Sequence, residues 1–373
     1  MNELRVYIHI PFCKSKCQYC DFNSYDSKDY LMDSYVEALC KEIDLYYYKI
    51  KNKKITSIYI GGGTPSYLKA SLIKKILSKF DFDKKCEVSI EINPETVSNI
   101  KLKAYKDMGI NRLSFGVQSL NDKLLRLMGR IHNKDTAINA IKLAKDRGFK
   151  NISVDLMFGY PLQPFEMYKQ TLEEIIKLNI QHISCYSLKI EKNTPLYTMM
   201  HKNMLPEVEE ELDRKMYHFT NSFLRKNDIF QYEISNYAKL GYKCKHNIGY
   251  WKLDDYIGFG ISAHSYFENK RFNNNEDIVE YIRGIKNNKL QVIFEENIDK
   301  EESKKEYIIL GLRLNSGINM NDYNKKYNTD FILEHGETLE TCIENKLIEV
   351  KGDIVKLTKK GKDLSNTVFV KFI

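Results

Sequence analysis

A length of 373 residues is enough for two domains, each with its own hydrophobic core. Hydrophobic residues make up 43% and charged residues 29% of the chain, which excludes an intrinsically disordered or fibrous protein. The net charge of +8 comes from lysines spread along the sequence among acidic residues, a distribution typical of solvated surfaces and unfavourable for a nucleic-acid interface.

An alternating β-branched pattern predicts a first strand over residues 5–10, and Pro11 ends it. The loop that follows carries three cysteines with the spacing C-x3-C-x2-C: Cys13, Cys17 and Cys20. Thiolates this close together bind zinc or an iron–sulfur cluster. Both kinds of site normally have four protein ligands, and no fourth Cys or His follows nearby, because Asp21 and Phe22 come next. The pattern therefore favours a four-iron cluster with one iron open to a non-protein ligand, over a zinc site or a disulfide.

Strand-like and helix-like segments alternate through the first half of the chain. The predicted strands are residues 5–10, 55–61, 86–92, 112–117, 151–158 and 182–189. Amphipathic stretches between them predict helices near residues 29–50, 67–79, 97–108, 134–147 and 165–179. Parallel strands joined by helices need right-handed crossovers, so we expect an α/β fold with an open, partial (β/α)6 barrel. Its site would lie at the C-terminal ends of the strands.

Glycine and polar residues occur at these strand ends. Glycines in the run 61–63 would let a ligand approach the backbone closely, although a tight turn would give the same pattern. Glu91 and Asp155 lie in predicted buried strands, where a carboxylate needs a partner or a ligand. Arg130 would suit a carboxylate ligand, but it and Gln118 each have a surface or structural alternative.

The last part of the chain, about residues 290–373, has a different pattern. Helical stretches at 299–313 and 321–345 precede two strands and a short closing helix. This predicts a smaller helical, winged-helix-like domain beside a core with an accessory segment over residues 1–280, with residues 273–275 expected to form a loop near the boundary. Some such modules bind DNA, but glutamates along the last long helix disfavour phosphate contact: Glu334, Glu337, Glu340 and Glu344.

Taken together, these motifs resemble the radical S-adenosylmethionine (SAM) superfamily. Its signature is C-x3-C-x2-C with an aromatic residue before the last cysteine, here Tyr19. The resemblance implies a 4Fe-4S cluster held by the three cysteines, with SAM on the open iron and a 5′-deoxyadenosyl radical as its product. Further segments are similar to the coproporphyrinogen III oxidase-like branch over essentially the whole chain: Tyr7-Ile-His-Ile-Pro-Phe-Cys13, Gly61-Gly-Gly-Thr-Pro65, Glu91-Ile-Asn-Pro-Glu95, Phe115-Gly-Val-Gln-Ser119, Asp155-Leu-Met-Phe-Gly159 and residues 258–263.

The same resemblance implies a set of SAM contacts in and between the predicted strands and in the segment after them. They are Tyr7, Tyr19, Gly62, Gly63, Thr64, Glu91, Gln118, Arg130, Asp155, Ser187 and His264.

The branch contains oxygen-independent coproporphyrinogen III oxidases and HemW-type haem chaperones. The oxidases carry a further cysteine two residues after the third, where this chain has Phe22, and an N-terminal extension that we expect to be missing here. Residues 246–251 instead match the chaperone motif His-Asn-x-x-Tyr-Trp, which implies haem contact at His246, Asn247, Tyr250 and Trp251. Imidazole ligates haem iron, and Tyr and Trp offer flat faces to a porphyrin. The alternatives are a structural His246, a core Trp251, and Cys244 as a second ligand or a buried thiol.

Three functions remain open. The first is a haem chaperone that binds a 4Fe-4S cluster, SAM and haem and passes haem to an acceptor protein. The second is an oxygen-independent coproporphyrinogen III oxidase, and the third is a binding module acting through the C-terminal domain. Whether SAM is cleaved stays open. Scattered cysteines and the lack of a leader or long apolar run indicate a reducing, cytoplasmic location without a transmembrane segment.

Overall fold

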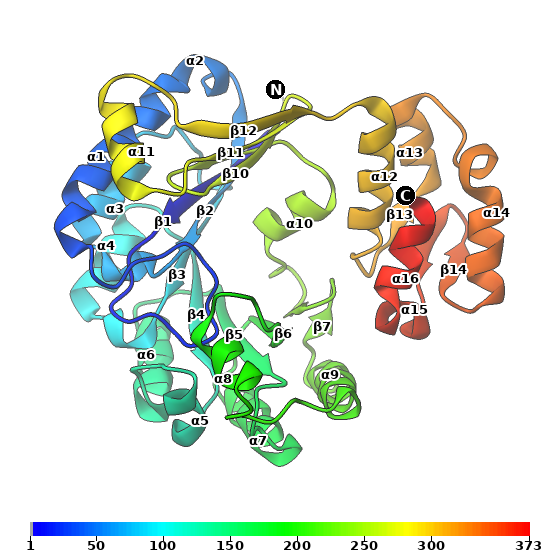
Figure 1. The fold of residues 1–373 in the computed structure, drawn as a ribbon, viewed down its shortest axis with the longest axis horizontal. Helices are drawn as coiled ribbons and strands as arrows, with labels where there is room; N and C mark the ends of the chain where they lie inside the picture. Colours follow the sequence, from blue (N-terminus) through cyan, green and yellow to red (C-terminus); the bar gives the residue numbers. More distant parts are fainter. Residues whose placement is uncertain (1–2) are drawn as a thin grey trace.

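The computed structural model describes residues 3–373, in which twelve strands form one mixed sheet beside a separate three-stranded sheet (Figure 1). Six neighbouring parallel strands run in sequence order through the centre of the larger sheet, as the sequence predicts. They are β1 (Glu3–Ile10), β2 (Lys54–Gly62), β3 (Glu87–Ile92), β4 (Arg112–Gln118), β5 (Ile152–Phe158) and β6 (His182–Ser187). The α/β fold with a partial barrel is thereby confirmed.

Helices connect these strands and cover the outer face of the sheet (Figure 1). They are α1 (Met32–Leu45), the short α2 (Tyr47–Ile50), α3 (Ala70–Leu77), α4 (Asn99–Asp107), α5 (Asp122–Leu127), α6 (Lys134–Asp146) and α7 (Phe165–Lys177). Local side chains fix several starts: the Asn133 side chain accepts a hydrogen bond from the Thr136 amide and begins α6. The predicted stretch 29–50 divides into several pieces in the structure.

The sheet extends on both sides of the six parallel strands, which the sequence did not predict. On the β1 side follow β9 (Tyr256–Phe259), β10 (His264–Phe267), β11 (Lys270–Asn274) and β12 (Val292–Asn297). On the β6 side follow β8 (Asn236–Ala238) and β7 (Phe230–Gln231). Between these additions lie α8 (Pro195–His201), α9 (Glu210–Arg225), α10 (Lys245–Trp251) and α11 (Ile278–Lys286).

The prediction of a loop at residues 273–275 is wrong in part, because Asn273 and Asn274 belong to β11. The Asn274 amide is buried and donates to Glu42 Oε1 at 2.6 Å and to the Gly260 carbonyl at 2.9 Å. Glu42 Oε2 in turn accepts from Tyr281 at 2.6 Å and from the Gly260 amide at 2.8 Å. These bonds satisfy polar groups that would otherwise favour a solvent-exposed loop.

The C-terminal part has its own hydrophobic core, centred on residues such as Ile308, Phe331 and Val355. It contains α12 (Lys300–Gly311), β13 (Ile318–Asn319), α13 (Met320–Tyr327), α14 (Phe331–Glu344), β14 (Ile348–Lys351), β15 (Ile354–Leu357), α15 (Lys359–Asp363) and α16 (Ser365–Phe369). The predicted helical stretch 321–345 is two helices, because Asn328 adopts a left-handed conformation and Asp330 caps α14.

The two hydrophobic cores indicate where the N-terminal and C-terminal parts of the chain divide. Helix α11 and strand β12 pack with the core of the large sheet, through residues such as Tyr281 and Val292. The second core starts with Ile308 of α12. We therefore propose a division between β12 and α12, some residues later than the expected boundary at 280–290. Within residues 3–373, no helix combines the length and apolar character needed to cross a lipid bilayer.

Candidate functional site

The three cysteines of the loop after β1 line one cavity of about 440 Å³ at the C-terminal ends of the parallel strands. Backbone hydrogen bonds hold the loop to distant parts of the chain. The Cys13 amide donates to the Tyr25 carbonyl at 2.9 Å, and the Gln18 amide donates to the Met128 carbonyl at 3.0 Å. The loop is therefore fixed before any ligand binds.

The donor set fits an iron–sulfur cluster better than a single metal ion. No three His, Cys, Asp or Glu side chains among residues 3–373 converge on one ion position. A cluster differs from a single ion because each thiolate binds a different iron, so the sulfurs stand further apart. Burial raises the pKa of the Cys20 thiol to about 11 and also raises that of Cys13, so cluster binding would release protons from these thiols.

The glycine run after β2 lies directly against the cysteine loop. A Cβ atom on Gly63 would lie 2.9 Å from Cys13 Sγ and 3.0 Å from the Phe12 carbonyl oxygen, so only glycine fits there. Gly62 has a φ of +112°, which favours glycine, and its amide donates to Glu91 Oε2 at 3.1 Å. The Thr64 hydroxyl donates to Cys13 Sγ at 3.5 Å. This run both supports the cluster loop and lines the cavity.

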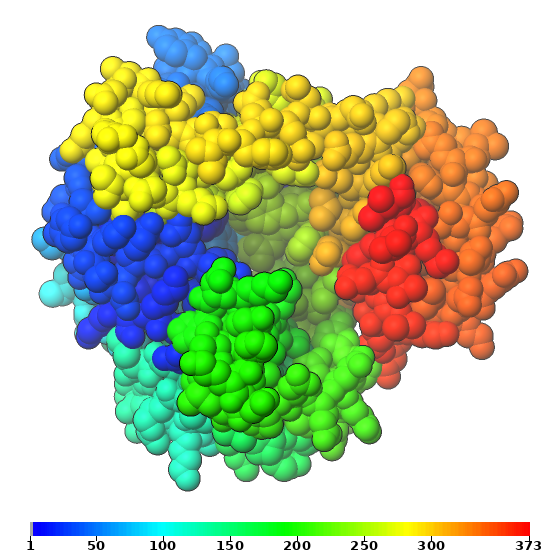
Figure 2. Space-filling view, viewed as in Figure 1, coloured from blue at the N-terminus to red at the C-terminus, as the bar shows by residue number. Residues whose placement is uncertain are grey.

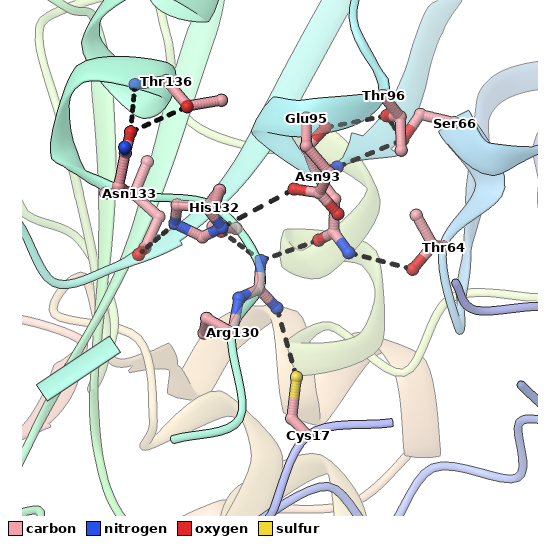
Figure 3. A network of polar contacts seen from close by, with 12 residues as sticks. Cys17, Thr64, Ser66, Asn93, Glu95, Thr96, Arg130, His132, Asn133 and Thr136 are labelled. Carbon is pink, nitrogen blue, oxygen red and sulfur yellow. Dashed lines mark hydrogen bonds and ion pairs between the residues drawn. The ribbon is translucent and has the colours of Figure 1, made fainter. Parts of the chain in front are cut away.

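Arg130 joins the cysteine loop to the strand ends (Figure 3). Its Nη2 donates to Asn93 Oδ1 at 2.8 Å and to the Gly116 carbonyl at 2.5 Å, while Nη1 donates to Cys17 Sγ at 3.5 Å. The Asn93 amide continues the network to the Thr64 hydroxyl at 3.1 Å. Both terminal nitrogens thus have protein acceptors, which favours a role in positioning the loop over a free fork for a ligand carboxylate.

Two carboxylates, Glu91 and Asp155, line the same cavity. Burial raises the pKa of Glu91 to about 7, with the charge of Asp155 adding to the effect, while hydrogen bonds from Tyr59 and the Gly62 amide oppose it. Burial also raises the pKa of Asp155, whose oxygens accept from the Ser114 hydroxyl at 3.2 Å. No lysine or arginine forms an ion pair with either group among the described residues. Two carboxylates without an ion-pair partner are suited to a cationic ligand.

We predict that SAM affinity falls as pH drops below 7. A cationic ligand prefers ionised Glu91, and protonation of a group with a pKa of about 7 removes that charge. The dissociation constant should rise about tenfold between pH 7 and pH 5.5, measured by equilibrium dialysis on anaerobically reconstituted protein. In Glu91→Gln the affinity should be lower and nearly flat over this range. A wild-type affinity that does not change with pH would contradict the assignment.

The other expected SAM residues divide into three groups. Tyr19, with Gln118, lines the cluster cavity, and Gln118 has a φ of +63°, a strained conformation at the point where β4 and β5 lose register. Ser187 does not line the cluster cavity or the second cavity described below, and its hydroxyl donates to the Asp213 carboxylate. Tyr7 and His264 line a second cavity of about 730 Å³. The structure therefore brings most, but not all, of the expected SAM residues together.

The His-Asn-x-x-Tyr-Trp motif forms α10, which packs between β2 and α12 (Figure 1). His246 is 1% exposed, and burial lowers its pKa to about 3. Its Nδ1 is paired with the Ser57 hydroxyl at 2.9 Å and its Nε2 with the Tyr250 hydroxyl at 2.8 Å. Both ring nitrogens are thus occupied, which favours the structural alternative for this histidine.

The other three residues of the motif do not all line the same cavity. Tyr250 and Trp251 line the second cavity, whereas Asn247 lines neither cavity. Cys244 is fully buried and its thiol donates to Glu87 Oε1 at 3.6 Å, as a structural thiol would.

Several residues of the cluster cavity were not singled out from the sequence. They are Asn93, Ser114, Met157, Tyr186, Leu188, Lys189 and Glu191. Asn93 lies in the motif of residues 91–95, which the sequence analysis singled out for Glu91. The hydrogen bonds of Asn93 with Arg130 and Thr64 are seen only in the structure. Tyr186 and Leu188 flank Ser187, so the neighbours of the residue singled out from the sequence line this cavity.

Family models match two parts of the chain. Residues 7–175 match the radical SAM superfamily, and residues 298–364 match the HemN C-terminal domain. Superfamily membership implies a 4Fe-4S cluster and SAM, for which the cavity with the three cysteines has suitable donors.

Curated relatives match along the full chain. A protein of Bacillus subtilis named heme chaperone HemW is 36% identical over 99% of this chain and 98% of its own length. The protein of the same name from Lactococcus lactis is 33% identical over 99% of this chain and 97% of its own length. Among solved structures, the coproporphyrinogen III oxidase HemN of Escherichia coli superposes with a TM-score of 0.87, 22% identity and coverage of 100% of this chain and 90% of that chain. This last likeness concerns the fold alone.

Proposed function

This chain belongs to the HemW family of the radical SAM superfamily, and on that premise we propose that it is a haem chaperone. It would bind a 4Fe-4S cluster, SAM and haem, and pass haem to an acceptor protein. The observation that carries the proposal is the full-length similarity to proteins named heme chaperone HemW. The aromatic part of the His-Asn-x-x-Tyr-Trp motif supports it, because Tyr250 and Trp251 line a cavity next to that of the cysteines. The reducing, cytoplasmic location stays a prediction.

We assign roles to the site residues as part of this proposal. Cys13, Cys17 and Cys20 hold the cluster, which supplies an electron and an open iron when bound. Glu91 and Asp155 balance the positive charge of SAM, and the Gly62–Thr64 segment presents its backbone to it. Arg130 and Asn93 keep the cysteine loop against the strand ends. His246 fixes the Tyr250 ring from behind and does not need to touch haem itself.

The alternative function, a coproporphyrinogen III oxidase, is consistent with the fold similarity to HemN, but the residue at position 22 disfavours it. Phe22 replaces the additional cysteine expected of an oxidase and is 59% exposed at the wall of both cavities. The third candidate, a module acting through the C-terminal domain, has no observation in its favour beyond the domain itself.

A titration tests the haem proposal. Anaerobically reconstituted protein should bind haem with a distinct absorption band, and Trp251→Ala should bind it about tenfold more weakly because a flat contact face is lost. The control is Tyr48→Ala, which removes an aromatic side chain that is 79% exposed and outside both cavities. Equal haem binding by the wild type and Trp251→Ala would remove the motif from the haem site.

A further inference from the structure

Two cavities lie side by side on the inner face of the sheet and share part of one wall. The first holds the cysteines, and the second is larger, at about 730 Å³. Asp21 and Phe22, which directly follow the third cysteine, line both of them. A ligand in the second cavity would therefore lie beside the cluster loop and next to the first cavity. Figure 2 shows the hollow face of the molecule between the yellow and green segments and the red C-terminal helices.

The second cavity is built largely from aromatic rings that the strand periodicity places on one face. Tyr7 on β1 alternates with the fully buried Val6 and Ile8, which face the opposite side. Tyr266 on β10 pairs with Tyr256 on β9, and both line the cavity. The remaining aromatic walls come from Phe22, Tyr250 and Trp251. A volume of this size, with six aromatic side chains in its wall beside charged and polar ones, is suited to a planar, conjugated ligand that also carries polar groups.

Among residues 3–373, one histidine of this cavity has ring nitrogens that make no hydrogen bond. His9 also lines it, but its Nδ1 is paired with the Tyr7 hydroxyl at 3.0 Å and its Nε2 with the Asn23 carbonyl at 2.9 Å. His246 lies behind Tyr250 with both nitrogens bonded. His264 is exposed, lines the cavity, and makes no side-chain hydrogen bond or ion pair with any of residues 3–373. Its place on β10, opposite Asn273 of β11, fixes its backbone.

We propose that haem binds in this second cavity with the imidazole of His264 as an axial ligand of its iron. The inference rests on the proposed function and adds where haem binds and which residue ligates its iron. Neutral imidazole is a common iron ligand, and a rigid strand is a suitable support for it. Phe22, Trp251 and Tyr250 supply the contact surface for the porphyrin ring.

The charges around the cavity restrict where the propionates of haem can lie. Its one cationic lining residue within the described chain is Arg271, which is held by Glu296 and Glu306. Asp21, Asp254 and Glu276 also line it. Asp21 and Glu276 are exposed and Asp254 is partly exposed, so the propionates of haem should avoid these three positions.

The test is a haem titration of anaerobically reconstituted His264→Ala, with absorption and electron paramagnetic resonance spectra of the ferric complex. His264→Ala should lower haem affinity at least tenfold and shift the absorption band, while the iron content of the cluster stays at the wild-type value. Added imidazole should restore the wild-type spectrum, which loss of a merely structural histidine would not allow. The matched control is His201→Ala, an exposed histidine outside both cavities.

The outcomes separate this inference from the proposed function. Wild-type affinity and spectrum in His264→Ala would refute the axial role of His264 and leave the haem chaperone proposal standing. Spectral loss in His246→Ala that imidazole restores, with no effect of His264→Ala, would move the ligand to α10. If the wild type binds no haem, the proposed function fails and this inference fails with it.

Discussion

Replacing Cys17 with serine should remove the iron–sulfur cluster and lower bound iron to less than about a tenth of the wild-type amount. A 4Fe-4S cluster needs soft thiolate ligands, and with only three of them no protein sulfur can replace the lost one. Cys17 lines the cluster cavity, and its Sγ also accepts a hydrogen bond from Arg130 Nη1 at 3.5 Å, a bond that a serine hydroxyl can still accept, so the loss of iron would report the missing thiolate. Iron analysis and the visible absorption band after anaerobic reconstitution would measure the effect.

The control for this variant is the same substitution at a buried thiol elsewhere. Cys40 is 4% exposed in α1, where its thiol donates to the Lys75 carbonyl at 3.8 Å, and it lies outside the cavity. Cys40→Ser should keep its iron. If Cys17→Ser kept full iron and the wild-type band, the cluster assignment would be wrong.

The second large effect is expected for Gly63→Ala, which adds a single methyl group. That methyl would lie 2.9 Å from Cys13 Sγ and within 3.1 Å of the carbonyl oxygens of Phe12 and Ile10, so the cysteine loop must move away from β2. Overpacking of this kind costs about 1–3 kcal/mol. We expect a lower unfolding midpoint and a loss of most of the cluster, because Cys13 is displaced.

A glycine in a different setting provides the matched control. Gly336 lies inside α14, and a Cβ there would be 3.7 Å from its nearest neighbour, Ile332 Cγ2. Gly336→Ala should therefore stabilise the protein by about 0.5–1 kcal/mol, since alanine favours helix. Denaturant unfolding and iron content measure both variants. A fully loaded and equally stable Gly63→Ala protein would show that the loop does not need this close approach.

Periodicity and spacing were enough to predict the central part of the fold. The six parallel strands are strongly patterned, with buried residues such as Val6 and Ile8 at alternate positions, so their location could be read from the sequence. The C-x3-C-x2-C group and the glycine run also stand next to strand ends, which places them in one cavity once the strands are parallel.

The second cavity could not be predicted in this way. Its walls come from segments as distant as Tyr7, Trp251 and Arg271, which meet because β9 pairs with β1 and β10 to β12 follow it. Those added strands are short, and β11 contains asparagines that normally favour loops. The hydrogen bonds of the His246 ring were also not predicted. The spacing of four residues between His246 and Tyr250 on one helix would have indicated the bond between these two side chains.

The most direct test of the central claim offers coproporphyrinogen III and haem in parallel to anaerobically reconstituted protein with SAM and a reductant. Chromatography would follow porphyrin products, and the absorption band would follow haem and its transfer to an added apoprotein. A haem chaperone should bind haem and release it to the acceptor without forming decarboxylated porphyrin. Decarboxylated product without stable haem binding would contradict the account and make this protein an oxidase despite Phe22 and the motif on α10.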